Sequence, residues 1–115
     1  MAAANLSLLA VTVAATGTIA TNRLVTPAGA QCGADGVALG VARTAAVSGN
    51  KIAVDVLGTA IVEAGAAVTL GDTLKSDSSG RAITWATSGA RVGIALSAAG
   101  AAGDLIEALL IHDAT

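Results

Sequence analysis

The chain is built from short apolar runs separated by turns that are rich in glycine and small polar residues. The clearest run covers residues 51–57, where Ile52, Val54 and Val56 share one face and Asp55 lies on the other. A period of two predicts a β-strand with one packed face and one face toward water. We therefore expect Asp55 to be solvated.

The remaining apolar runs are also short and rich in β-branched residues, which favours strands over helices. The predicted strands cover residues 6–13, 18–26, 37–42, 59–62, 67–70, 73–75, 81–87, 92–96 and 105–111. Gly58 is predicted to form a turn between two of them. A short helix at residues 2–4 stays open as an alternative, because alanine favours helices. The pattern predicts an all-β fold, a small antiparallel β-barrel or sandwich with an extended N-terminal segment.

A loop containing Pro27 and several glycines marks one break in this pattern. We expect residues 1–35 to form an N-terminal arm or pair of strands followed by a loop. Residues 36–115 are expected to form the β-barrel domain.

A weak internal repeat relates residues 40–46 to residues 93–99. Each copy precedes a glycine-containing turn, a charged residue (Lys51 or Asp104) and an apolar strand. This order predicts one strand-turn-strand unit used twice. The alternative is chance alignment within an alanine-, glycine- and valine-rich sequence.

Composition limits the stability of a lone subunit. Hydrophobic residues make up 54% of the 115 residues, but aromatic residues make up only 1%. Each buried alanine contributes much less than the roughly 1.5–3 kcal/mol of a buried leucine or isoleucine. Many small domains are stabilised by disulfides or metals, but this chain has one cysteine and one histidine, which are too few for either. We therefore expect the chain to form a homo-oligomer.

The charge pattern argues against two classes of partner. Charged residues make up 12% of the chain and the net charge is -2, so no basic field is present for nucleic acid. The first basic residue is Arg23, which leaves the apolar N-terminus without the positive region of a secretory signal. No run reaches the roughly 18 apolar residues of a membrane-spanning helix. A soluble, non-secreted chain without membrane contact is expected, and its single thiol suits a reducing compartment.

Catalytic and metal-binding arrangements have weak support. Phosphate-loop and dinucleotide motifs are absent. Cys32 and His112, with Asp113 as an orienting group, supply the residue types of a nucleophile and base but lack the flanking signature of any such family. We expect no enzyme activity and no cofactor.

Asp72 and Asp77 lie among serine oxygens that could suggest a Ca²⁺ loop, but their spacing does not match the known pattern. We expect no metal. Instead, Gly71 and Asp72 are predicted to form a corner, and Asp77 to cap a hairpin in which Gly80 has a positive φ.

Trp85 is the only large aromatic residue of the chain. A solitary tryptophan buries a large area at once, so we expect it to be a core or interface anchor. A ligand-stacking role is the less favoured alternative.

The order of several motifs resembles the small phage capsid cement, or head decoration, proteins. The resemblance covers residues 36–110, and the first 35 residues carry little of it. Its motifs are Gly40-Val41-Ala42, Lys51 at the start of a strand, the Gly58 turn, Ala64-Gly65-Ala66, Gly71-Asp72-Thr73-Leu74, Asp77 to Gly80 with Arg81-Ala82, the segment from Val92 to Leu96, and Gly103-Asp104 before a final strand.

This resemblance implies a structural protein of the virion. Such a protein is made in the host cytoplasm, binds the outer surface of an assembled head and bridges major capsid subunits, commonly as a trimer. It implies the major capsid protein and further copies of the chain as partners, with a trimer favoured over a dimer.

A biotinyl- or lipoyl-carrier-like module is the alternative function. Such modules also use a duplicated strand unit and a Gly-Asp corner like Gly71-Asp72. They require a modified lysine within a family signature, which neither Lys51 nor Lys75 has.

Overall fold

The computed structural model describes residues 7–111, and these residues form strands and turns. The eight strands are β1 (Ser7–Ala14), β2 (Leu24–Val25), β3 (Gly40–Ala42), β4 (Lys51–Glu63), β5 (Thr73–Ser76), β6 (Ala82–Thr84), β7 (Gly93–Ala95) and β8 (Leu105–Leu110). No helix in this part of the chain is long and apolar enough to cross a membrane.

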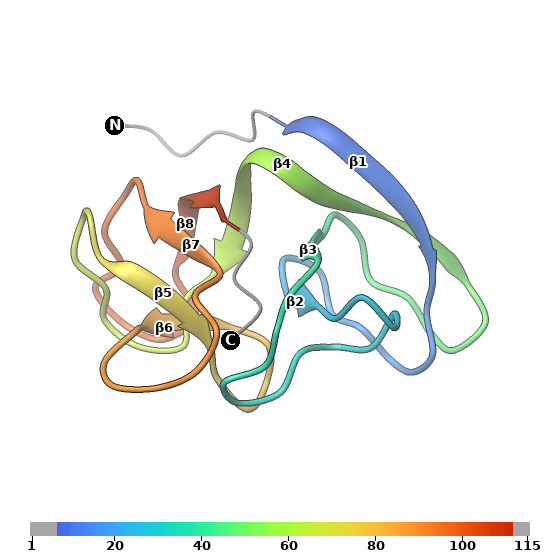
Figure 1. The fold of residues 1–115 in the computed structure, drawn as a ribbon, viewed down its shortest axis with the longest axis horizontal. Helices are drawn as coiled ribbons and strands as arrows, with labels where there is room; N and C mark the ends of the chain where they lie inside the picture. The colour runs from blue at the N-terminus through green and yellow to red at the C-terminus, as the bar shows by residue number, and fades with distance from the viewer. Residues whose placement is uncertain (1–6, 112–115) are drawn as a thin grey trace.

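The strands form one antiparallel sheet that is rolled into a nearly closed barrel (Figure 1). Its order is β2-β3-β4-β8-β7-β5-β6, and β1 pairs with β4 beside this path. An isolated bridge between Ala64 and Ala82 connects the end of β4 to β6 and brings the two sides of the roll together. The predicted all-β barrel is confirmed.

Strand β4 connects the two halves of the molecule (Figure 1). Its first part pairs with β1 and β3, and its second part pairs with β8. The change occurs near Gly58, whose φ of 92° is a conformation that glycine adopts without steric penalty. The predicted turn at Gly58 is therefore wrong, because the chain continues through this residue as one strand of 13 residues.

The two halves repeat the same pairing pattern. In the first half, Leu24 of β2 pairs with Val41 of β3. In the second, Thr73 of β5 pairs with Ile94 of β7. Two isolated bridges also correspond, Ile19 with Ala46 and Val68 with Ala99. The predicted repeat is thus confirmed in the strand pairing, and β4 serves both units.

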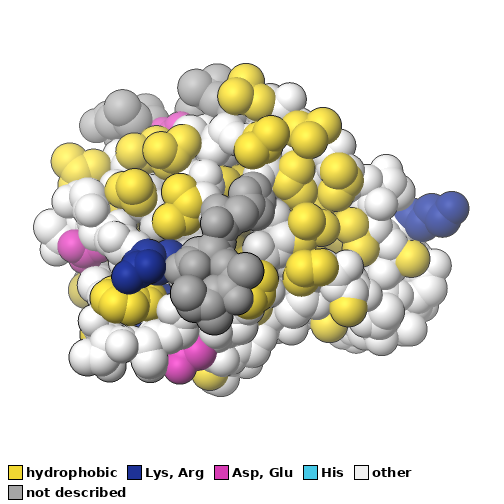
Figure 2. Space-filling view, viewed as in Figure 1, with side chains coloured by type: hydrophobic (Ala, Val, Ile, Leu, Met, Phe, Trp, Pro, Cys, Tyr) yellow, Lys and Arg dark blue, Asp and Glu magenta, His cyan; other side chains and the backbone are white. Residues whose placement is uncertain are grey.

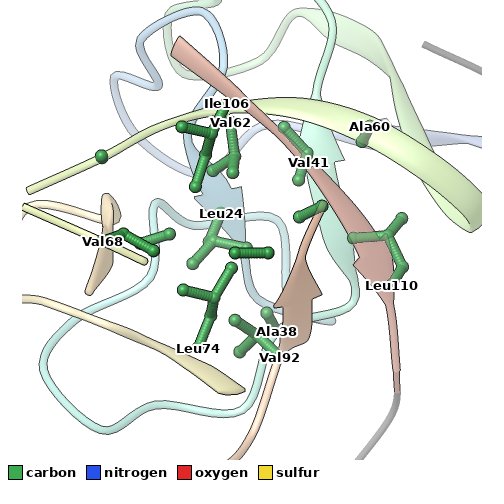
Figure 3. Close-up of a cluster of buried hydrophobic side chains, with 14 of the residues drawn as sticks. Leu24, Ala38, Val41, Ala60, Val62, Val68, Leu74, Val92, Ile106 and Leu110 are labelled. Carbon is green, nitrogen blue, oxygen red and sulfur yellow. The ribbon is translucent and has the colours of Figure 1, made fainter. Parts of the chain in front are cut away.

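The larger hydrophobic cluster fills the barrel between β4, β5, β7 and β8 (Figure 3). Leu24 and Cys32 from the N-terminal segment belong to this cluster. A smaller cluster contains Ile52, Val54 and Val56, as their alternation predicts. The division of the chain at residue 35 stays a prediction, although the first segment supplies residues to both clusters.

Three other expectations are wrong. Residues 18–26 do not form one strand, because a turn at residues 21–22 separates the bridge at Ile19 from β2. Asp55 is buried rather than solvated, because Arg43 from the end of β3 forms an ion pair with it. Residues 67–70 form no strand, since only Val68 makes a bridge and its neighbours Thr69 and Leu70 are exposed in the turn.

Candidate functional site

A band of exposed leucines crosses the outer surface of β1, β4 and β8. Leu9 lies directly opposite Leu57, and Leu109 lies opposite Thr59, two residues further along β4. Side chains at such opposite and diagonal positions are neighbours on one face of a sheet. We call Leu9, Leu57, Leu105 and Leu109 the leucine band; their exposed fractions are 47%, 44%, 52% and 40%.

The surface that carries the band is poor in charge. Figure 2 shows hydrophobic side chains gathered over the region of β1, β4, β7 and β8, with few charged groups on this face. Soluble monomers rarely expose large contiguous apolar patches, so a patch of this kind is typical of an interaction surface. The sequence alone does not reveal the band, because the pairing register that brings its residues together is not visible in it.

Glu107 lies between two members of the band on β8 but is itself buried. Its backbone N–H donates to Ser97 Oγ at 3.0 Å, whereas its side-chain Oε1 has no hydrogen-bond partner among the described residues. A buried carboxylate oxygen without a partner is unfavourable. No sequence motif singled out this residue, since an acidic residue in a strand is ordinarily exposed.

An ion-pair cluster joins the N-terminal segment to the barrel. Arg23 Nη2 lies 3.3 Å from Glu63 Oε1, and Arg81 Nη1 lies 3.6 Å from Glu63 Oε2. Arg23 also donates to the carbonyl of Ser79 at 2.9 Å. Three segments are thereby held together: the residues before β2, the end of β4 and the turn between β5 and β6.

Gly71 and Asp72 lie in the turn before β5. Gly71 has a φ of 92°. Asp72 Oδ2 accepts hydrogen bonds from the Thr69 backbone N–H and from Thr84 Oγ1, both at 3.0 Å. The carboxylate therefore connects this turn to β6.

Asp77 lies in the turn between β5 and β6. Its Oδ1 accepts hydrogen bonds from the backbone N–H groups of Ser79 at 2.8 Å and Arg81 at 2.9 Å, while Oδ2 forms an ion pair with Arg81 at 3.3 Å. Gly80 in the same turn has a φ of 76°. These contacts are those of a hairpin cap. The described residues contain no group of three or more His, Cys, Asp or Glu that could hold a metal ion.

Trp85 follows β6 and is partly buried. Its indole N–H donates to the Gly89 carbonyl at 2.8 Å, and the guanidinium carbon of Arg91 lies 4.4 Å from the ring centroid. The ring thus holds the loop between β6 and β7. Its role as a core or interface anchor stays a prediction.

Cys32 is buried in the larger cluster, and its Sγ lies 3.8 Å from the Val37 carbonyl oxygen. Burial raises the pKa of the Cys32 thiol, against the opposing effect of hydrogen bonds with Ser76 and Gly33. A nucleophilic cysteine requires the reverse, an accessible thiol with a lowered pKa. His112 and Asp113, its suggested partners, lie outside the described residues.

The two lysines considered for a carrier function lie in different settings. Lys51 is exposed at the first position of β4. Lys75 Nζ forms an ion pair with Asp35 Oδ1 at 2.8 Å and donates to the Ser88 carbonyl at 3.3 Å. A carrier module places its modified lysine at the tip of a β-hairpin. Lys51 and Lys75 lie within strands β4 and β5 instead.

A sequence comparison assigns the chain to a family. The family model described as "Phage cement protein" matches residues 4–110. The chain belongs to the phage cement protein family. This is a structural family without enzyme activity, as the sequence predicts, and membership implies association with a virion capsid. The expectation that residues 1–35 carry little resemblance is wrong, because the match begins at residue 4.

A comparison of structures gives a similar fold. The N base of head fibre gp8.5 from bacteriophage phi29 superposes with a TM-score of 0.73 and is 18% identical in sequence. The match covers 93% of this cement protein and 98% of the phi29 chain. At this identity the likeness shows the fold alone. No curated protein matches the chain in sequence.

Proposed function

We propose that this cement protein binds the outer surface of an assembled phage head and bridges neighbouring major capsid subunits, which stabilises the shell. The observation that supports the proposal is the leucine band, an uncharged apolar surface on the outside of the barrel in a member of the cement family. Binding to the assembled shell and not to separate subunits adds its free energy to shell stability. Many copies multiply the effect.

Self-association is part of the proposal, and a trimer is the form that the family resemblance implies. The core supports it indirectly, because alanine supplies many of its buried residues and aromatic side chains supply none. Burial of the band against a neighbour would add apolar area that the isolated subunit leaves in water.

The proposal is tested by mixing purified protein with assembled heads and, separately, with dissociated capsid subunits. Sedimentation should recover the protein with heads, and heads that carry it should resist heat at higher temperature than bare heads. The double variant Leu57→Ser/Leu109→Ser should bind heads much more weakly. Val47→Ser is the matched control, because Val47 is 56% exposed but lies in the β3–β4 turn outside the band.

Two results would contradict the proposal. One is wild-type protein that stays in the supernatant with intact heads. The other is a leucine-band variant that binds as tightly as the Val47 control. Intact mass spectrometry tests the carrier alternative, which requires a covalent addition on lysine.

A further inference from the structure

Strand β1 leaves one edge without a partner strand. It pairs with β4 on one side, and within residues 7–111 no other strand pairs with it. Figure 1 shows β1 at the outer margin of the molecule, beyond β4. An open strand edge offers backbone N–H and C=O groups to another extended segment.

The pairing register identifies the groups that face this edge. Arg43 N–H donates to the Ala53 carbonyl, so Ala53 directs its backbone groups toward β3. Because successive residues alternate, Ile52 and Val54 direct theirs toward Val13 and Val11 of β1. Ala10 and Thr12 therefore present their backbone N–H and C=O groups to the open edge, and both residues are exposed.

Between Leu9 and Val13 the edge lacks the usual protection against pairing, whereas Gly29 lies against the Ala14 carbonyl at the end of the strand. Natural edge strands carry charged residues, proline or bulges. Strand β1 reads SLLAVTVA, with no charge and no proline. Its one extra residue is Leu8, between the pairs Ser7–Gly58 and Leu9–Leu57, whereas the irregularity at Leu9 and Ala10 comes from an extra residue of β4. From Leu9 onward, β1 itself is regular.

We propose that two copies of this protein pair through their β1 strands, antiparallel about a two-fold axis at Val11. A like copy is favoured as the occupant because the edge is complementary to itself. The axis places Val11 opposite Val11 of the second copy, and Ala10 opposite Thr12, without bringing like charges together. Val11 and Val13, which are only partly buried beside the smaller hydrophobic cluster, gain apolar neighbours.

The proposal goes beyond the proposed function. A two-fold contact cannot close a trimer, since the same patch meets itself. On a shell, it would connect copies that occupy neighbouring positions. If the two β1 strands do not pair, head binding is still expected. If the protein does not bind heads, the β1 contact can still be measured in solution.

Val11→Cys tests the geometry. Residues opposite one another in a non-hydrogen-bonded antiparallel pair lie about 4.5 Å apart at Cα, within reach of a disulfide. Under mild oxidation, Val11→Cys should give a covalent dimer on a non-reducing gel. Thr87→Cys, which is exposed in the β6–β7 loop, is the control for disulfides that form by random collision. Buried Cys32 is present in both variants and does not affect the comparison. Equal dimer yields from the two variants would overturn the proposal.

Thr12→Pro tests the hydrogen bonds of the edge. Proline removes an N–H that faces away from β4, a position where strands tolerate it. Analytical ultracentrifugation should show association of the wild type that is weakened about tenfold or more in Thr12→Pro, and unchanged in Thr12→Val, which keeps the N–H. A wild type that stays monomeric at high concentration, or a folded Thr12→Pro that associates normally, would refute the contact. If Thr12→Pro does not fold, the Val11→Cys yield decides.

Discussion

Arg43 Nε lies 2.6 Å from Asp55 Oδ1, and the two side chains differ sharply in exposure. The Asp55 side chain is 3% exposed, whereas that of Arg43 is 44% exposed. The partly solvated guanidinium thus covers a carboxylate in the middle of β4. This pair explains how an acidic residue occupies a buried position in the strand that joins both halves of the barrel.

Replacement of Arg43 by methionine should lower the free energy of unfolding by about 1–2 kcal/mol. The change leaves the Asp55 carboxylate buried without its partner while keeping a long apolar side chain. Chemical denaturation of Arg43→Met, Asp55→Asn and the double variant measures the coupling. Additive losses would show that the ion pair contributes nothing, because independent sites add.

The fold was more predictable from the sequence than the site was. The alternation that places Ile52, Val54 and Val56 on one face of β4 predicts that this face packs in the core, and it does. The apparent turn at Gly58 was wrong for a physical reason. A glycine with a positive φ can bend a strand as well as end it, and only the pairing with β8 shows which occurs.

Contacts between distant segments account for what the sequence could not show. The burial of Asp55 depends on Arg43, twelve residues away in sequence. The proximity of Leu9 and Leu57 depends on a pairing between β1 and β4. Alternation alone predicts each strand's two faces but not which strand lies beside it.

The Cys32 thiol should make stability fall as pH rises. Its pKa in the folded protein is raised above the ordinary value of 9.0 by burial, so the folded state holds the proton more tightly than the unfolded state does. The resulting stabilisation is fully present below pH 9.0 and is lost as pH rises through the folded-state pKa.

The test compares the free energy of unfolding of wild type and Cys32→Ala between pH 7 and 11. The difference between the two proteins isolates the contribution of Cys32, because every other ionisable group is present in both. A difference that is independent of pH would contradict the raised pKa. Thiol reagents should label wild-type Cys32 quickly in denaturant and slowly in the folded protein, because the thiol is buried.

Trp85→Ala should lower the free energy of unfolding by about 1–2 kcal/mol. The substitution removes the hydrogen bond to Gly89 and the stacking of Arg91 on a partly buried ring. A fully buried tryptophan would be expected to lose about 3–5 kcal/mol. Thermal unfolding measures the change, and Trp85→Phe, which keeps a ring without the N–H donor, should lose less.

A loss of stability outside this range would assign Trp85 a different role. An unchanged melting temperature together with weaker oligomerisation or head binding would assign the ring to an interface. Because Trp85 is the only tryptophan, its fluorescence also reports on Arg91. Arg91→Ala should therefore alter the emission spectrum of the folded protein.

Gly65→Ala should destabilise the barrel closure by about 1–3 kcal/mol. Gly65 donates to the Ala82 carbonyl at 2.8 Å beside the bridge between β4 and β6. A Cβ at this position would overlap Asp77 Oδ2 and would lie 3.0 Å from Ile83 Cγ2. The carboxylate cannot move away freely, because its other oxygen is held by two backbone N–H groups.

Gly33→Ala is the matched control, since a Cβ there meets nothing within 4 Å. Its melting temperature should stay close to that of the wild type, while Gly65→Ala melts lower. Combining Gly65→Ala with Asp77→Ala should cost less than the sum of the single changes, because the second substitution removes the obstructing carboxylate. Strictly additive losses would show instead that Gly65→Ala acts through the backbone conformation of residue 65 and not through overlap with the Asp77 carboxylate.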